Sequence, residues 1–174
     1  GRGITTLTIS HAGTGFDLTG TGNDVGFSNL TINRTTGTGD DIQIAAGYAR
    51  TSIRDVLFSG GGIAVDDHGE DLRLSDVWCT GNGWTSFVRL DAATRPYITS
   101  LVAAPGNSWT RGIDIDTGTV SARITNLDIS PTAAVSGIGV HVRDSAAGND
   151  PTDIVLTEPH LECGATGNAI EIDA

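Results

Sequence analysis

The stretch Phe27-Ser28-Asn29-Leu30-Thr31-Ile32 decides the fold, because the same six-residue phrase occurs seven times along the chain. Each copy contains an apolar residue, two polar residues, an aliphatic residue, a variable residue and, in most copies, a further apolar residue. A structural unit that repeats every 21 to 32 residues predicts a solenoid. The other copies begin at Ile4, Ile53, Leu74, Ile98, Ile124 and, in a degenerate form, Leu156.

A second short apolar segment follows each copy of the phrase. These segments alternate apolar residues with other residues, which is the pattern of a strand with one buried face. The connections between them are rich in Gly, Asn, Thr and Asp, which accept turn conformations. The segments lie at 16–18, 42–44, 63–65, 88–90, 113–115, 138–140 and 170–172.

These two repeated features predict an all-β fold, a right-handed parallel β-helix of about seven coils with three short strands per coil. Residues 1–174 would form one such domain. Within the phrase, we expect the polar pair to make the tight turn between the second and third strands, with Asn29, Asp55, Asp76 or Asn126 at its end. The chain has no Met and begins abruptly at Gly1, so we also expect it to be a fragment of a longer polypeptide.

Composition narrows the classes of partner. The net charge of −11 argues against binding to nucleic acid or to an anionic membrane surface, since both need a cationic face.

Cys79 and Cys163 lie more than three repeats apart, about 15 Å along the axis at the spacing of parallel strands, which is too far for a disulfide. Cys79 occupies an apolar position of the phrase, so we expect a buried free thiol.

In its architecture the sequence resembles the pectate-lyase-like superfamily of right-handed parallel β-helices. That superfamily includes polysaccharide lyases, polygalacturonases and the tailspike or tail-fibre proteins of bacteriophages. The resemblance covers essentially the whole chain and implies that the first sheet lines a substrate groove. It also implies that a phage protein of this type would be a homotrimer or part of a larger virion assembly.

The motifs of the superfamily's hydrolases are missing. Asp66-Asp67-His68-Gly69 resembles the acidic pair and the histidine of polygalacturonases only by composition. The chain contains no Gly-His-Gly, and it contains no Lys, which the fourth motif of these enzymes requires. His11, His68 and His160 are scattered along the chain without metal-ligand spacing, so we expect no dedicated metal site.

A charged column is the main candidate for function. Between residues 63 and 142 the second strand has a 25-residue register, which would align four outward side chains, with a pair of Arg89 and Asp114 beside them. Stacked carboxylates could bind a polysaccharide, hold Ca²⁺ or supply the acid and base of glycoside hydrolysis. They could equally form a solvated edge that discourages aggregation. The column consists of Asp66, Asp91, Asp116 and His141.

The same register places Trp84 over Trp109 and Asn82 over Asn107 at the edge of this face. Exposed indole rings form flat platforms on which sugar rings can rest. The alternative is that the two indoles pack down over their own loops and cap the core.

We therefore predict a phage tail-spike or tail-fibre module, located in the virion, that recognises its host by binding cell-surface polysaccharide through one rigid face. The first alternative is an extracellular polysaccharide lyase or hydrolase. In that enzyme Asp91 and Asp116, or Asp114, would be the acid and base, and Arg89 would stabilise charge. The second alternative is a purely structural virion rod.

Overall fold

The computed structural model describes residues 5–106, 109–131, 137–144, 149–163 and 167–173. All secondary-structure elements in the described residues are β-strands. No helix long and apolar enough to cross a membrane occurs among these residues. The strands are β1 (Thr5–Ile9), β2 (Phe16–Leu18), β3 (Thr21–Asn23), β4 (Gly26–Arg34), β5 (Asp40–Ile44), β6 (Gly47–Ala49), β7 (Ser52–Ser59), β8 (Gly62–Asp67), β9 (Arg73–Gly81), β10 (Trp84–Leu90), β11 (Tyr97–Pro105), β12 (Trp109–Ile115), β13 (Arg123–Ile129), β14 (Ile138–Arg143), β15 (Val155–Thr157), β16 (His160–Leu161) and β17 (Asn168–Asp173).

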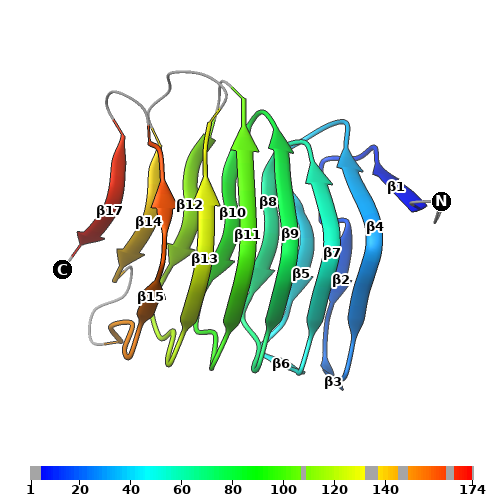
Figure 1. The fold of residues 1–174 in the computed structure, drawn as a ribbon. Helices are drawn as coiled ribbons and strands as arrows, with labels where there is room; N and C mark the ends of the chain where they lie inside the picture. The colour runs from blue at the N-terminus through cyan, green and yellow to red at the C-terminus, as the bar shows by residue number, and fades with distance from the viewer. Residues whose placement is uncertain (1–4, 107–108, 132–136, 145–148, 164–166, 174) are drawn as a thin grey trace.

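Two parallel sheets face one another along the molecule (Figure 1). The front sheet has the order β1-β4-β7-β9-β11-β13-β15, with β16 also paired to β13. The rear sheet has the order β17-β14-β12-β10-β8-β5-β2. Each strand pairs with its counterpart one coil later rather than with its neighbour in sequence, which confirms the all-β parallel β-helix.

The third side of each coil is shorter than predicted. Among the described residues only β3 and β6 pair there as strands, and the later coils are joined by single bridging residues instead. About five successive turns are linked in this way on the third side, so the predictions of about seven full coils and three strands per coil were too high. The bridging residues are Ala49, Glu70, Thr94, Val120 and Thr152.

The polar pair makes a bend in the copies of the phrase from the second onward, whereas Thr6 of the first copy has no positive φ. Asn29, Asp55, Asp76 and Asn126 have φ angles of 55°, 54°, 52° and 51°, in the left-handed region that Asn and Asp tolerate best among residues with a side chain. Each bend lies within a continuous strand of the front sheet rather than between two separate strands. Ser100 adopts the same conformation in β11, with φ of 54°.

The core consists of apolar side chains stacked coil upon coil. One column in the rear sheet joins Ile42, Val65, Val88, Ile113 and Val140, all at most 2% exposed. Burying an aliphatic side chain of this size contributes about 1.5–3 kcal/mol, so the column is a main source of stability. It also fixes which rear-sheet residues point outward, because alternate side chains of a strand lie on opposite faces.

Both cysteines are free and buried, as predicted. Burial raises the pKa of the Cys79 thiol well above its usual range, since the charged thiolate is poorly solvated in the core. Cys79 therefore acts as a small apolar residue.

Candidate functional site

The register of the rear sheet differs from the predicted one on both sides of β10 and β12. These two strands pair with the expected step of 25 residues, so Leu90 lies beside Ile115. The step from β8 to β10 is 23 residues and the step from β12 to β14 is 27, because Asp66 pairs with Arg89 and Asp114 pairs with His141. The predicted single column of Asp66, Asp91, Asp116 and His141 was therefore wrong.

The residues of that column instead fall into two adjacent outward columns, which we call together the charged face. The central column comes from within β8, β10, β12, β14 and β17, and the edge column follows it by two residues in each coil. The central column contains Asp66, Arg89, Asp114, His141 and Glu171. The edge column contains His68, Asp91, Asp116, Arg143 and Asp173.

In the first half of the charged face, Arg89 lies among three carboxylates. Its Nη2 is 2.8 Å from Oδ2 of Asp91 and 3.9 Å from Oδ2 of Asp116, and its Nε is 3.9 Å from Oδ1 of Asp66. Nε2 of His68 lies 3.2 Å from Asp66, and this hydrogen bond, against the effect of burial, raises the pKa of His68. The cluster gathers the predicted Arg89 and Asp91, although the ion pairs of Arg89 differ from the predicted one with Asp114.

In the second half, Arg143 replaces Arg89 as the organising cation. Its Nε and Nη2 donate to the two carboxylate oxygens of Asp114 at 3.1 and 3.2 Å, and Nη2 also lies 2.6 Å from Oδ2 of Asp116. Such two-pronged contacts are among the strongest that a carboxylate makes. Arg143 was not among the predicted site residues, because the assumed register put His141 rather than Arg143 beside Asp116.

The acids and bases of the charged face lie at different depths. The side chains of Asp66, Asp114 and Asp116 are 4%, 2% and 1% exposed, whereas those of Arg89 and Arg143 are 30% and 26% exposed. A buried carboxylate is tolerated only when it is paired. The arginines therefore cover the carboxylates, and in the middle of the face it is mainly guanidinium groups that reach solvent.

A hollow lies at each end of the charged face. The first has a volume of about 380 Å³ and includes His68 in its lining, with Asp17, Gln43 and three small residues of β2, β5 and their loops. The second has a volume of about 490 Å³ and includes Glu171, beside Trp109, Ile138 and Asn168. Together they extend the surface that a long ligand would contact.

Asp40 is an acidic residue near this face that the sequence reasoning missed. Burial and the negative charge of Asp66 raise the pKa of its carboxyl, while Arg89, Arg34 and His68 act in the opposite direction. Asp40 pairs with Ile63 in the neighbouring strand, just before the central column begins. The adjacent acids Asp40 and Asp41 in front of a predicted strand were the available signal.

The two tryptophans stack as predicted, and they pack onto the core rather than forming an exposed platform. Trp84 pairs with Trp109, but they are only 1% and 4% exposed, so they form no platform for sugars. Phe87 packs edge-on against Trp84 and parallel to Trp109, with ring centroids 5.8 and 5.7 Å apart. Asn82 is exposed in the preceding loop. Asn107 lies outside the described residues.

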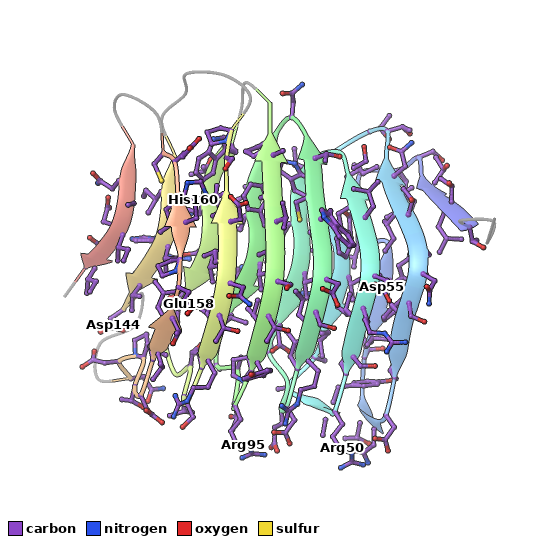
Figure 2. All side chains as sticks on the ribbon, in the orientation of Figure 1. Arg50, Asp55, Arg95, Asp144, Glu158 and His160 are labelled. Atoms are coloured by element: carbon purple, nitrogen blue, oxygen red, sulfur yellow. The ribbon has the colours of Figure 1, made fainter. Side chains whose placement is uncertain are left out.

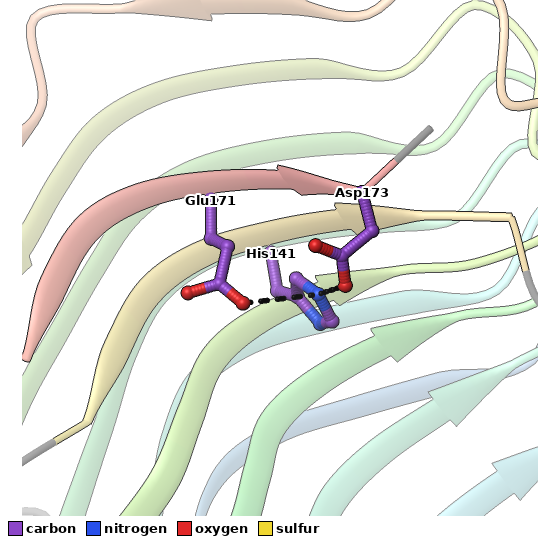
Figure 3. Close-up of side chains that lie close together, drawn as sticks. All are labelled: His141, Glu171 and Asp173. Atoms are coloured by element: carbon purple, nitrogen blue, oxygen red, sulfur yellow. Dashed lines mark hydrogen bonds and ion pairs between the residues drawn. The ribbon is translucent and has the colours of Figure 1, made fainter.

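At the end of the charged face, His141 approaches two carboxylates of β17 (Figure 3). Its Nε2 lies 2.9 Å from Asp173 and 3.9 Å from Glu171. His141 was a predicted site residue, whereas Glu171 and Asp173 were missed because the register was not carried into β17.

The chain matches no protein-family profile, no curated protein and no solved structure. The functional argument therefore depends on the fold and on the geometry of the charged face.

Proposed function

We propose that this chain is a β-helix module of the phage tail-spike or tail-fibre type, in the pectate-lyase-like superfamily, that binds a cell-surface polysaccharide with the charged face. The parallel β-helix supports the superfamily. Location in a virion, host recognition and a homotrimeric or larger assembly are parts of the proposal that come with the resemblance.

One observation carries the proposed binding: partly exposed charged groups are held in fixed positions by buried partners. Arg143 is anchored from below by the buried Asp114 and Asp116, Arg89 lies 3.9 Å from the buried Asp66 and Asp116, and His68 is anchored by Asp66. Sugar hydroxyl groups exchange hydrogen bonds with such groups, and little side-chain entropy is lost when the groups are already ordered. Adjacent coils repeat this arrangement about every 4.8 Å, which suits a polymeric ligand.

The geometry favours binding over cleavage. Glycoside hydrolysis needs two carboxyl groups that reach the same sugar linkage. Asp114 and Asp116 are almost completely buried under Arg143, and Asp91 is engaged by Arg89 at 2.8 Å. These acids are thus partners of arginines rather than reactants at the surface.

A structural rod without a ligand is the second candidate. Its support is that the charged face satisfies much of its own charge, with Arg89 and Arg143 each paired to more than one carboxylate. Ion pairs that join successive coils would then serve only to hold neighbouring coils together.

A glycan array, combined with assays for new reducing ends and for unsaturated products, tests these functions. Arg111 of β12 is a further partly exposed arginine of this face, 26% exposed and 3.7 Å from the buried Asp114. The arginine variants are Arg111→Ala and Arg89→Gln, and Arg95→Ala, at an exposed position on another side of the coil, is the matched control. Loss of one charged hydrogen bond is worth about 1.5–3 kcal/mol, so we expect each arginine variant to bind at least 10-fold more weakly. The array and the product assays are run both with Ca²⁺ and with EDTA, so that a Ca²⁺-dependent lyase would also be detected, and circular dichroism checks folding.

Each outcome decides between the candidates. Binding that falls in Arg111→Ala and Arg89→Gln but not in Arg95→Ala supports the proposal. No binding to any glycan supports the structural rod and overturns the proposal. Release of unsaturated products or of new reducing ends would show that the chain is a lyase or a hydrolase.

A further inference from the structure

We propose that His141, Glu171 and Asp173 form a binding site for one divalent ion of the first transition row, such as Zn²⁺. The site lies at the C-terminal end of the charged face, between β14 and β17. It does not depend on polysaccharide binding.

The three side chains converge on one point (Figure 3). Each offers one ligand atom, and the three atoms lie within 4.8 Å of one another. Around an ion with metal–ligand distances of about 2.0–2.2 Å, ligand atoms lie roughly 3–4 Å apart. The carboxylates of Glu171 and Asp173 are 31% and 61% exposed and have room to close this difference, while His141 is held in place with only 4% exposure.

A buried carboxylate stands behind the histidine, as is usual at metal sites. Oδ1 of Asp114 lies 3.2 Å from Nδ1 of His141, on the side of the ring away from Glu171 and Asp173. Histidines that bind metals generally donate the N–H of their other ring nitrogen to such a carboxylate, which orients the ring. Asp114 is itself fixed by the two contacts from Arg143. An acidic cluster alone would lack this support.

An ion bound to Nε2 of His141 requires the proton of the imidazole ring to be on the other nitrogen, Nδ1. Nδ1 of His141 lies 3.0 Å from Nε of Arg111 and 3.2 Å from Oδ1 of Asp114, so the tautomer of the ring decides which of the two it contacts. An ion on Nε2 requires the neutral ring to carry that proton on Nδ1, where Asp114 accepts it. Nε of Arg111 then takes Oδ1 of Asp114, which is 3.7 Å away, as its partner. The two carboxylates balance the charge of the ion.

The ligand types select the class of ion. An imidazole with two carboxylates suits Zn²⁺, Mn²⁺ or Co²⁺, whereas Ca²⁺ and Mg²⁺ prefer oxygen ligands alone. Three protein ligands leave a coordination position open, as in catalytic rather than structural zinc sites. Since Glu171 also lines the hollow of about 490 Å³, that position would be reached from the hollow.

The chain provides a matched control in His160, which also lies between two carboxylates. Its Nδ1 is 2.9 Å from Asp128 and its Nε2 is 3.5 Å from Glu162, so the two acids approach opposite ring nitrogens. A single ion cannot use both acids together with one nitrogen of this ring. His160 is exposed on the front sheet, where Figure 2 labels it.

The test is a titration with Zn²⁺ against a chromophoric chelator, together with the visible absorption of bound Co²⁺. We expect one ion per chain, at least 10-fold weaker binding in Glu171→Gln and in Asp173→Asn, and unchanged binding in His160→Ala. Both ligand variants change exposed side chains, so they should fold. Asp114→Asn should weaken Zn²⁺ binding about 10- to 100-fold as a positioning residue.

The proposal is overturned if the wild type binds no stoichiometric ion, or if Glu171→Gln and Asp173→Asn bind Zn²⁺ as the wild type does. A loss of binding in His160→Ala that equals the loss in Asp173→Asn would also overturn it, and so would Ca²⁺ that displaces Zn²⁺ at similar concentrations. Because these measurements use the metal alone, they remain valid whatever the glycan array shows.

Discussion

The molecule contains two arrays in which acids and bases from successive coils meet, and they differ in burial. The charged face covers the outside of the rear sheet, where the carboxylates of Asp114 and Asp116 are almost inaccessible. The second array, which we call the corner array, lies at the turn before the front sheet. Figure 2 shows two of its arginines, Arg50 and Arg95, projecting from the same edge of the molecule. The corner array consists of Asp24, Arg50, Asp71, Arg95, Arg123 and Asp153.

The contact distances in the two arrays are alike. Arg50 to Asp24 and Arg95 to Asp71 measure 2.8 and 2.9 Å, against 3.1 Å from Arg143 to Asp114. The arginines of the corner array, however, are more than half exposed in these two pairs. Ion pairs in water contribute little, whereas breaking a buried pair leaves an uncompensated charge. Burial rather than distance therefore decides which array matters for stability.

The largest expected effect comes from removing a buried acid of the charged face. Asp114→Ala removes two hydrogen bonds of Arg143, the carboxylate 3.7 Å from Nε of Arg111 and the carboxylate beside Nδ1 of His141. We expect a loss of about 3–5 kcal/mol in the free energy of unfolding. Urea unfolding in EDTA, followed by circular dichroism, measures this loss without a contribution from bound metal.

Asp71→Asn in the corner array is the matched control, since it too removes an acid that an arginine contacts through Nε and Nη2 and keeps a residue that tolerates the positive φ of this position. Its unfolding midpoint should stay close to that of the wild type. Equal losses in the two variants would show that burial does not separate the two arrays.

How far the fold could be predicted is clear from the front sheet. The repeated phrase predicted both the parallel stacking and a change of direction at Asn29, Asp55, Asp76 and Asn126, although it was predicted as a turn between two strands and is a left-handed bend within one. Apolar spacing and the conformational tolerance of Asn and Asp are local properties. The corner array was not predicted, although Arg50 and Arg95 also have positive φ angles. Arginine has no such preference, but Asp24, Asp71 and Asp153 of the same array also have positive φ angles, so the local signal there lay in the aspartates and was not used.

The charged face was predicted in its residues but not in its arrangement. The sequence reasoning aligned Val65 with Leu90, since both are apolar, but in the structure Leu90 lies beside Asp67 and Val65 beside Val88. A carboxylate in an inward position breaks the apolar pattern on which the register was based. A shift of two residues keeps each strand face unchanged, so the alternation itself could not reveal the error.

Asp67 gives the second prediction, because it places a carboxyl group in the core instead of on either array. It lies at the same register position as the core residues Leu90 and Ile44. Burial raises the pKa of its carboxyl to about 6, although Oδ1 accepts a hydrogen bond from the backbone N–H of Gly69 at 3.0 Å. The carboxyl group of Asp67 therefore binds its proton more tightly in the native state than in the unfolded state.

The sign of the pH dependence follows from this direction. A carboxyl with a raised pKa contributes stability that is complete below the usual value near 3.8 and is lost as the pH rises through about 6. The difference between these two pKa values corresponds to about 3 kcal/mol in the free energy of unfolding. We expect Asp67→Asn to lose less stability than the wild type between pH 4 and pH 7, as measured by urea unfolding at several pH values. Identical pH profiles for the two proteins would contradict the assignment of Asp67 to the core.

The smallest expected effect belongs to the corner array and acts in the opposite direction on the pH axis. The hydrogen bonds from Arg95, against a small effect of burial, lower the pKa of Asp71. A lowered pKa contributes stability above the usual value near 3.8, and this stability is lost as the pH falls through the folded value. Arg95→Ala should therefore return the pKa of Asp71 towards its usual value in a carboxyl NMR titration.

The unfolding midpoint of Arg95→Ala at pH 7 should differ little from that of the wild type, and less still in 0.5 M salt, because added salt screens exposed charges. A salt-insensitive loss as large as that of Asp114→Ala would mean that the corner array also carries stability, and the contrast between the two arrays would then fail.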